Sequence, residues 1–390
     1  MALSFENTEL AFRYKSNKEL NKAHLLFKAM RISWLTKIGM KMAEWVFKFH
    51  LPFTGILKAT VFKQFCGGET LEEAGLTSLH LNKFDVGVAL DYSVEGKESE
   101  NDFQRTLEEI LKAIRFAANS DADIPFVPVK VTGFVRFDLL AKLHAGDLLT
   151  NAEQAEWEKA KSRLHEIAKV AKENNIRILI DAEHSWIQIP LDVITDELME
   201  KYNKEYPYVY NTFQMYRHDR LSFLKKSHKK AQEKGYILGA KFVRGAYMEL
   251  ERQRALEKGY PSPINATKAD TDKEFNQALK YALEHIDEIA SFIGTHNEES
   301  CLKATRIMEE KGIPATHKHV YFSQLYGMSD NITFNLAAAG YQAGKYLPYG
   351  PVKDVIPYLL RRAEENSSVS DQTGREFDLL DQEKKRRKSI

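Results

Sequence analysis

From residue 86 onward, short apolar segments rich in β-branched residues alternate eight times with longer amphipathic segments. Near-continuous apolar strands are typical of a parallel sheet that is buried on both faces. Eight strand–helix repeats favour closure of this sheet into a (βα)8 barrel, so we predict the α/β fold class. The predicted strands are 86–92, 126–133, 176–183, 208–214, 238–246, 291–297, 320–327 and 343–350.

The 390 residues exceed the length of about 250 that is typical of one such barrel, and the surplus lies at the ends. Residues 1–85 carry apolar residues at helical spacing and show no strand-like alternation. Five consecutive basic residues, Lys384 to Lys388, are typical of a solvated end. We therefore expect a helical arm at 1–85, the barrel at 86–370 and a flexible basic tail at 371–390.

The arm has a basic character, with eleven Lys or Arg and four Asp or Glu between residues 1 and 65. Phe27, Trp34, Trp45 and Phe49 accompany these charges. A basic amphipathic arm with aromatic residues is suited to an anionic membrane surface. The alternative is a helical arm that packs on the barrel with its charges in water. We favour this alternative, because helices that cover barrels show the same pattern.

Composition and targeting signals indicate a cytoplasmic protein. The formal charge is +1 and no basic face dominates, so we expect no nucleic-acid partner. Cys66 and Cys301 match no metal or redox spacing, which favours two reduced structural thiols. The first residues hold Glu6 and Glu9 and lack the apolar core of a secretory signal. No segment approaches the roughly 18 apolar residues of a membrane span, so contact with the inner face of the cell membrane would be peripheral.

Several common motifs are absent from the sequence. It contains no GxGxxG after a strand, no P-loop, no GxSxG and no HExxH. A nucleotide would therefore be held by something other than a Rossmann loop, and we expect no metal site.

Polar or ionisable residues end seven of the eight predicted strands. The carboxyl ends of barrel strands meet on one face, where active sites form. A helix cap would explain one polar strand end, but seven of them predict a functional face, since buried charges without a purpose are costly. The residues are Asp91 with Glu95 in the next loop, Lys130, Thr132, Asp181, Glu183, Gln214, Lys241, Arg244, Thr295, His296, Asn297, Tyr346 and Tyr349.

The segment after the last strand predicts a helix with one functional face. Asp354 is a plausible N-cap, which would place Pro357 in the first turn. Adjacent arginines beside a tyrosine suit the binding of a carboxylate or phosphate. The alternative is a solvent-facing arginine pair that bonds to a glutamate within the helix. The residues at spacing i, i+3, i+4 and i+7 are Tyr358, Arg361, Arg362 and Glu365.

Six segments, in order over roughly 86–370, resemble the proline dehydrogenase family. The combination of VRGAY with YLxRRxxEN is highly specific for that family. The chain looks like the monofunctional branch, which lacks the aldehyde-dehydrogenase half of the fused bacterial enzymes. The segments are VKVTGF around Lys130, DAEHSW around Asp181, KFVRGAYMELER around Gly245, GTHNEES around His296, QLYGM around Leu325 and KYLPYGPVKDVIPYLLRRAEEN around the double arginine.

This resemblance implies an FAD-dependent enzyme with a distorted TIM-like barrel. It would oxidise L-proline to 1-pyrroline-5-carboxylate, the first step of proline catabolism to glutamate. Hydride would pass from substrate C5 to flavin N5, and the electrons to a quinone. Two alternatives stay open: a barrel flavoprotein that oxidises another cyclic amino acid such as hydroxyproline, and a non-catalytic membrane-associated barrel.

The resemblance also implies roles for individual residues. Asp181 and Lys241 would be catalytic, and Glu95 would be a gate that pairs with Arg361. Bifunctional relatives usually carry Arg in place of Lys241, and a lysine keeps the charge without the planar fork. The substrate would be bound through its carboxylate by Lys130, Arg361 and Arg362 and enclosed by Leu325, Tyr346 and Tyr358. FAD would be lined by Ala182, Gln214, Val243, Arg244, Gly245, Thr295, His296, Asn297 and Glu365.

Overall fold

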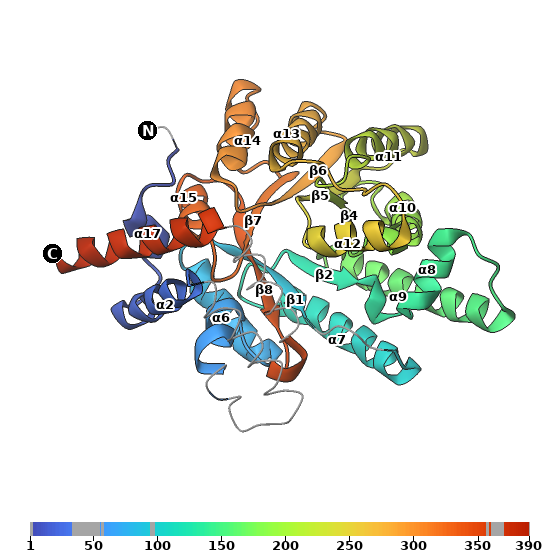
Figure 1. Ribbon diagram of the computed structural model, residues 1–390, viewed down its shortest axis with the longest axis horizontal. Helices are drawn as coiled ribbons and strands as arrows, with labels where there is room; N and C mark the ends of the chain where they lie inside the picture. Colours follow the sequence, from blue (N-terminus) through green and yellow to red (C-terminus); the bar gives the residue numbers. More distant parts are fainter. Residues whose placement is uncertain are drawn as a thin grey trace. The chain divides into compact units, whose positions relative to one another are not determined.

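The computed structural model describes residues 3–32, 55, 58–93, 98–355, 359 and 370–389. Eight parallel strands close into a barrel in chain order, which confirms the predicted α/β fold class (Figure 1). All eight predicted strands are present. They are β1 (Gly87–Tyr92), β2 (Phe126–Lys130), β3 (Arg177–Asp181), β4 (Val209–Gln214), β5 (Leu238–Val243), β6 (Ile289–Gly294), β7 (Val320–Leu325) and β8 (Ala343–Tyr349).

Helices follow the strands as the alternating pattern predicts (Figure 1). Several of them begin at side-chain caps, including Ser99, Thr150 and Thr267, each of which accepts a backbone N–H of the first helical turn. The connecting helices are α7 (Glu100–Asn119), α8 (Phe137–Ala145), α9 (Asn151–Glu173), α10 (Gln188–Tyr202), α11 (Arg220–Lys234), α12 (Met248–Lys258), α13 (Lys268–Glu284), α14 (Glu298–Glu310) and α15 (Asp330–Ala338).

The observed strands end before several of the predicted ones. Residues Val131–Gly133 form a short 3-10 turn, η2, directly after β2, and Ser185–Ile187 form another, η3, after β3. After β5, the chain leaves the sheet at Val243, so Arg244 and Gly245 lie in the loop. The polar residues at these positions thus lie in turns and loops that directly follow the strands.

The chain divides into two compact units. Unit 1 consists of Met1–Glu95, Asp121–Asp123 and Gln324–Ile390, and unit 2 of Gly96–Ser120 and Ile124–Ser323. Strands β1 and β8 therefore belong to unit 1 and β2 to β6 to unit 2, while β7 begins in unit 2 and ends in unit 1. The expected boundaries at 85 and 370 do not coincide with this division.

Aromatic rings fill the interior of unit 2 near the amino ends of its strands. The ring of Phe126 lies 4.9 Å from those of Phe292 and Tyr321 and 5.6 Å from that of Tyr210, centroid to centroid. All four side chains are buried. A barrel interior packed in this way is a core and not a pore, which leaves the carboxyl ends of the strands for a site.

Unit 1 has its own apolar core, to which both ends of the chain contribute. It combines α1 (Thr8–Phe12), α2 (Asn17–Met30), η1 (Lys58–Phe62), α5 (Lys63–Phe65) and α17 (Ser370–Lys388), and α6 (Leu71–Asn82) precedes β1. Phe27 is 1% exposed within this core. The described part of the arm is thus helical and packed, as in the favoured interpretation; Trp34, Trp45 and Phe49 lie outside the described residues.

The basic tail differs from the flexible end that the sequence predicts. It forms α17, which packs beside α2 (Figure 1). Glu383 is fully buried and accepts hydrogen bonds from Arg386 and Arg387. Arg387 also donates to the carbonyl oxygen of Phe12 at 2.8 Å. Because a buried carboxylate binds these guanidinium groups, the run of positive charge is ordered.

The two cysteines of the chain lie in its interior. Cys66 and Cys301 are both free and buried, and burial raises the pKa of each thiol to about 12.

Among the helices that the structure describes, none combines the length and apolar character needed to cross a bilayer.

A buried ion pair joins β8 to the start of α15 within unit 1. Lys345 Nζ lies 2.8 Å from Asp330 Oδ1, and the two side chains are 0% and 3% exposed. The hydroxyl of Tyr14 donates to Asp330 Oδ2 at 2.7 Å. Burial opposes ionisation of Asp330, but the charges of Lys345 and Lys15 hold its pKa below the usual value.

We predict that Asp330→Asn lowers the free energy of unfolding by about 3–5 kcal/mol, because it leaves Lys345 as a buried cation without its counter-charge. Urea denaturation followed by circular dichroism measures the change. The matched control is Glu173→Gln, which removes an exposed ion pair with Lys169 and should cost less than about 1 kcal/mol. Equal losses for the two variants would contradict the prediction.

Candidate active site

The polar strand ends of unit 2 lie at one edge of its sheet. Lys130 ends β2 and Asp181 ends β3, and the two are direct partners in the parallel register. Gln214 ends β4, and Lys241 lies on β5 opposite Thr212 of β4. Since the strands are parallel, these residues all face the carboxyl-end side of the barrel, where the sequence predicted them.

At the centre of this edge, one carboxylate lies between two lysines. Asp181 Oδ1 accepts a hydrogen bond from Lys241 Nζ at 2.5 Å, and Asp181 Oδ2 lies 3.6 Å from Lys130 Nζ. The three side chains are only 8–14% exposed. This trio carries two formal positive charges and one negative charge. Two lysines in such a weakly solvated position suit an anionic ligand.

A second polar layer lies just beyond the trio. Thr132 Oγ1 donates to Glu183 Oε1 at 2.8 Å, and Gln214 Nε2 donates to the backbone oxygen of Glu183 at 2.9 Å. Gln214 is 2% exposed, and its Oε1 is buried without a hydrogen-bond partner among the residues that the structure describes. A buried, unsatisfied acceptor is unfavourable, so Gln214 Oε1 suits an N–H or O–H group of a ligand.

The guanidinium of Arg244 is fixed in place by three partners. Its Nε donates to Asp272 Oδ1 at 2.8 Å, its Nη1 to Thr295 Oγ1 at 2.7 Å and its Nη2 to Ser300 Oγ at 3.0 Å. The guanidinium also lies over the ring of Phe275, 4.3 Å from its centroid. Further N–H groups of the fork stay available to an anion in this rigid orientation.

Two of the three partners of Arg244, Thr295 and Ser300, lie at the start of α14. Asn297 caps this helix and accepts the N–H of Ser300 at 2.8 Å, while Thr295 Oγ1 accepts the N–H of Asn297 at 3.2 Å. A helix amino end carries a partial positive charge and suits phosphate groups. Arg244 adds a full charge there.

Gly245 gives the loop after β5 a backbone conformation and a close contact that other residues would not tolerate. Its φ is +129°, and a Cβ at this position would lie 2.5 Å from the ring of Tyr216. The backbone can therefore pass close over Tyr216 only with glycine.

These features fit the FAD that the family resemblance implies. A fixed arginine beside a helix amino end suits a pyrophosphate, Gln214 offers an unsatisfied acceptor, and Gly245 provides a bare backbone. Ala182, Val243 and His296 lie on the same strand-end segments. Their contacts with FAD remain predictions.

In unit 1, the structure places Leu325 and Tyr346 on neighbouring segments. The N–H of Tyr326, next to Leu325, donates to the carbonyl oxygen of Tyr346 at 2.9 Å. Tyr346 is 8% exposed, and Leu325 is partly buried against the unit 1 core. The backbones of the two segments thus lie side by side where β7 ends, and a common role for Leu325 and Tyr346 remains a prediction.

Five predicted site residues lie outside the described part of the chain: Glu95, Tyr358, Arg361, Arg362 and Glu365. The prediction that Asp354 caps the last helix is wrong. Residues 352–355 are already helical, and the N–H of Asp354 donates to the carbonyl oxygen of Pro351 at 2.9 Å. Pro351 precedes the helix, which starts earlier than the side-chain pattern suggested.

The residues that hold Arg244 in place were not among the predicted site residues, apart from Thr295. Asp272 lies in α13 and Ser300 in α14, and neither is near Arg244 in the sequence. Burial opposes ionisation of Asp272, but hydrogen bonds from Lys268 and Arg244 lower its pKa. No motif spacing reveals these partners, because they meet only when the helices pack.

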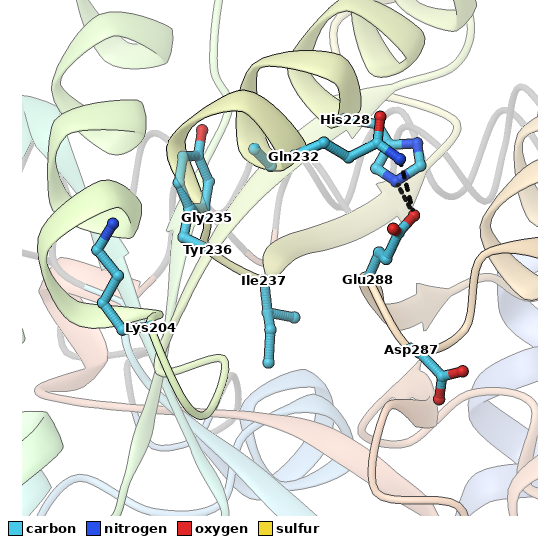
Figure 2. Close-up of a pocket in the computed structure, with 9 residues that line it drawn as sticks. Lys204, His228, Gln232, Gly235, Tyr236, Ile237, Asp287 and Glu288 are labelled. Carbon is cyan, nitrogen blue, oxygen red and sulfur yellow. Dashed lines mark hydrogen bonds and ion pairs between the residues drawn. The ribbon is translucent and has the colours of Figure 1, made fainter.

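A pocket of about 330 Å³ lies at the other end of the strands in unit 2 (Figure 2). Its walls include Tyr236 and Ile237, which precede β5, and Glu288, which precedes β6. His228 Nε2 and Glu288 Oε2 are 2.7 Å apart, and Gln232 donates to the same oxygen at 3.1 Å (Figure 2). These polar groups bind one another, so the pocket is a poor candidate for the active site.

Comparison with known proteins identifies relatives over most of the chain. Residues 76–375 match the sequence model of a family described as "Proline dehydrogenase". "Proline dehydrogenase 1, mitochondrial" from Dictyostelium discoideum is 31% identical and covers 98% of this chain and 74% of its own length. A protein named "Hydroxyproline dehydrogenase" from Xenopus laevis is also 31% identical and covers 99% of this chain and 90% of its own.

The fold is also similar to a solved structure. A crystal structure of proline utilization A from Bdellovibrio bacteriovorus matches with a TM-score of 0.74 and 22% sequence identity. The match covers 95% of this chain and 40% of that longer protein. At this level of identity, the likeness supports the barrel architecture alone.

The close approach at Gly245 leads to a stability prediction. Gly245→Ala should lower the free energy of unfolding by about 3 kcal/mol, because it combines a strained φ with a clash against Tyr216. Gly259→Ala is the matched control: φ is +72°, nothing lies within 4 Å of the added Cβ, and the expected loss is about 1–2 kcal/mol. Thermal unfolding compares the two, and a smaller loss for Gly245→Ala than for Gly259→Ala would refute the steric argument.

Proposed function

The chain belongs to the proline dehydrogenase family of oxidoreductases, and we propose that it oxidises L-proline to 1-pyrroline-5-carboxylate with FAD as cofactor. The observation that carries this proposal is the trio of Lys130, Asp181 and Lys241 at the strand ends. The trio offers positive charge for an amino-acid carboxylate and for a flavin that gains electrons.

We propose that the carboxylate of proline is the anchor of the substrate, because it takes no part in the reaction. Lys130 binds it together with Arg361 and Arg362. Charge-assisted hydrogen bonds from several cations fix its position and hence the orientation of the ring. Lys130 is suited to this role because its side chain is 14% exposed and its position is set by the strand register with Asp181.

The apolar ring of proline requires flat or aliphatic walls. We propose that Leu325, Tyr346 and Tyr358 provide them, and that Glu95 closes the site by pairing with Arg361. The position of Leu325 at the end of β7, on a segment whose backbone bonds to Tyr346 in β8, supports this role for two of the three.

When bound, FAD supplies at N5 the acceptor for the hydride that leaves proline C5. Lys241 would hold positive charge near that atom, and Asp181 would fix the lysine through their 2.5 Å hydrogen bond. Lys241 supplies the charge of the arginine found in bifunctional relatives without its planar fork. The cofactor would be held by Ala182, Gln214, Val243, Arg244, Gly245, Thr295, His296, Asn297 and Glu365.

We further propose that the electrons pass to a quinone in the membrane. The protein would be cytoplasmic, with the arm in peripheral contact with the inner face of the cell membrane. The basic composition of residues 1–65 supports the contact, although the described part of the arm uses its apolar face in the unit 1 core. Co-sedimentation with anionic vesicles tests this contact, and protein that stays in the supernatant would refute it.

Hydroxyproline is the second candidate substrate, since a hydroxyproline dehydrogenase is similar over 99% of this chain. Tyr346 favours proline. The family resemblance implies a small residue at this position in the hydroxyproline branch, which would leave room for the hydroxyl, whereas a tyrosine would fill that space.

The experiment that tests the function is anaerobic mixing of the flavin-loaded protein with L-proline. We expect the flavin absorbance band to bleach within seconds, because hydride transfer reduces the cofactor. Protein with full flavin content that does not bleach with L-proline would refute the proposal. Bleaching by trans-4-hydroxy-L-proline with a higher kcat/KM would instead support the second candidate.

We predict that Tyr346→Ser shifts substrate preference. The ratio of kcat/KM for trans-4-hydroxy-L-proline over L-proline should rise by about ten- to a hundredfold, because the variant makes room for the hydroxyl. Tyr346→Phe is the matched control and should keep the preference for proline, since the ring remains. Steady-state kinetics on both substrates measures the shift, and an unchanged ratio in Tyr346→Ser would remove Tyr346 from the substrate wall.

A further inference from the structure

Helix α12, shown in yellow in Figure 1, follows the cofactor-binding loop after β5 and buries little apolar surface. Its buried residues are Glu251 and Ala255, while Leu250 and Leu256 are 52% and 84% exposed. A surface helix normally buries an apolar stripe. The position of α12 must therefore depend largely on polar contacts.

The carboxylate of Glu251 makes the most buried of these contacts. Glu251 is 0% exposed, and its Oε1 accepts the backbone N–H of Ser185 at 2.6 Å. Its Oε2 accepts the hydroxyl of the same serine, also at 2.6 Å. Two short hydrogen bonds to a buried charge are strong and directional.

Ring contacts reinforce the same junction. His184 stacks on Trp186 with 4.3 Å between ring centroids and lies 4.5 Å from the ring of Tyr247. The guanidinium carbon of Arg254 lies over Trp186, 4.3 Å from the ring centroid. The segment after β3 is thus joined to the segment after β5 by a buried carboxylate and a layer of rings.

Both segments carry residues assigned to the cofactor. Ser185 follows Asp181 and Ala182 after β3, and Glu251 follows Arg244 and Gly245 after β5. We propose that the Glu251–Ser185 pair is a clasp that fixes the distance between these two cofactor-binding segments. Glu251 is then a positioning residue for FAD, which rests on the flavin dependence proposed above. It acts through Ser185, since both its oxygens bond to that residue.

The test measures FAD affinity and not only activity. Apoprotein is titrated with FAD, and the quenching of flavin fluorescence gives the Kd. Ser185→Ala, which removes one of the two hydrogen bonds, should raise the Kd about tenfold, and Glu251→Ala, which removes both, should raise it by at least as much. The double variant should bind FAD within about twofold of Glu251→Ala, because without the carboxylate the serine hydroxyl has no partner in the clasp.

Two controls separate the clasp from general effects on the helix. Glu249→Ala removes a carboxylate from the same helix whose side chain is 77% exposed, and the FAD Kd should stay within about twofold of the wild type. Glu251→Gln can still accept the backbone N–H and bond to the hydroxyl, so it should restore most of the affinity. Circular dichroism verifies that each variant is folded.

The outcomes distinguish this proposal from the proposed function. Wild-type protein that binds no FAD would refute the function itself. A second outcome would overturn the clasp alone. In that outcome the wild-type protein binds FAD and bleaches with L-proline, but folded Ser185→Ala has the same FAD Kd as Glu249→Ala. Single effects that multiply in the double variant would also overturn it. If Glu251→Ala does not fold, Ser185→Ala decides, because it keeps the carboxylate and its bond to the backbone N–H.

Discussion

The ionic contact of Asp181 with Lys130 and Lys241 is the interaction on which the candidate site depends. Charged groups that leave water are costly unless they are paired. The barrel provides the pairing through its strand register, which sets Lys130 opposite Asp181. Lys241 reaches the same carboxylate from β5, two strands away from β3. Charge placement is thus a direct consequence of the pairing of strands β2 to β5, and the arginine and helix end that suit phosphate are arranged on the same strands and helices.

Much of the fold and of this edge could be predicted from the sequence. Strands that are buried on both faces appear in the sequence as short apolar runs. Polar residues such as Lys130 and Asp181 end these runs and so mark where the strands stop. Contacts between distant segments left no such signal. Glu251 lies in the charged segment MELERQR, and this pattern predicts a surface residue. Its burial depends on Ser185 in another loop. Asp272 reads as a solvated helix residue for the same reason.

The basic ends of the chain show a related limit of sequence interpretation. A count of charges treats each lysine or arginine as available to a partner. In unit 1, Arg386 and Arg387 bind the buried Glu383, and Lys15 lies 3.6 Å from the buried Asp330. Ion pairs within the unit thus use part of the positive charge that suggested a membrane surface or a flexible end. Whether a basic run is free depends on acids that lie far from it in the sequence.

Cys66 and Cys301 are the only two cysteines of the chain, and both are buried with thiol pKa values of about 12. At neutral pH, almost no thiolate is present to react with an alkylating reagent or an oxidant. A cysteine introduced on the surface would then be labelled alone. A fluorophore or spin probe could be attached at one chosen surface position, for example on α12, without first removing the native cysteines.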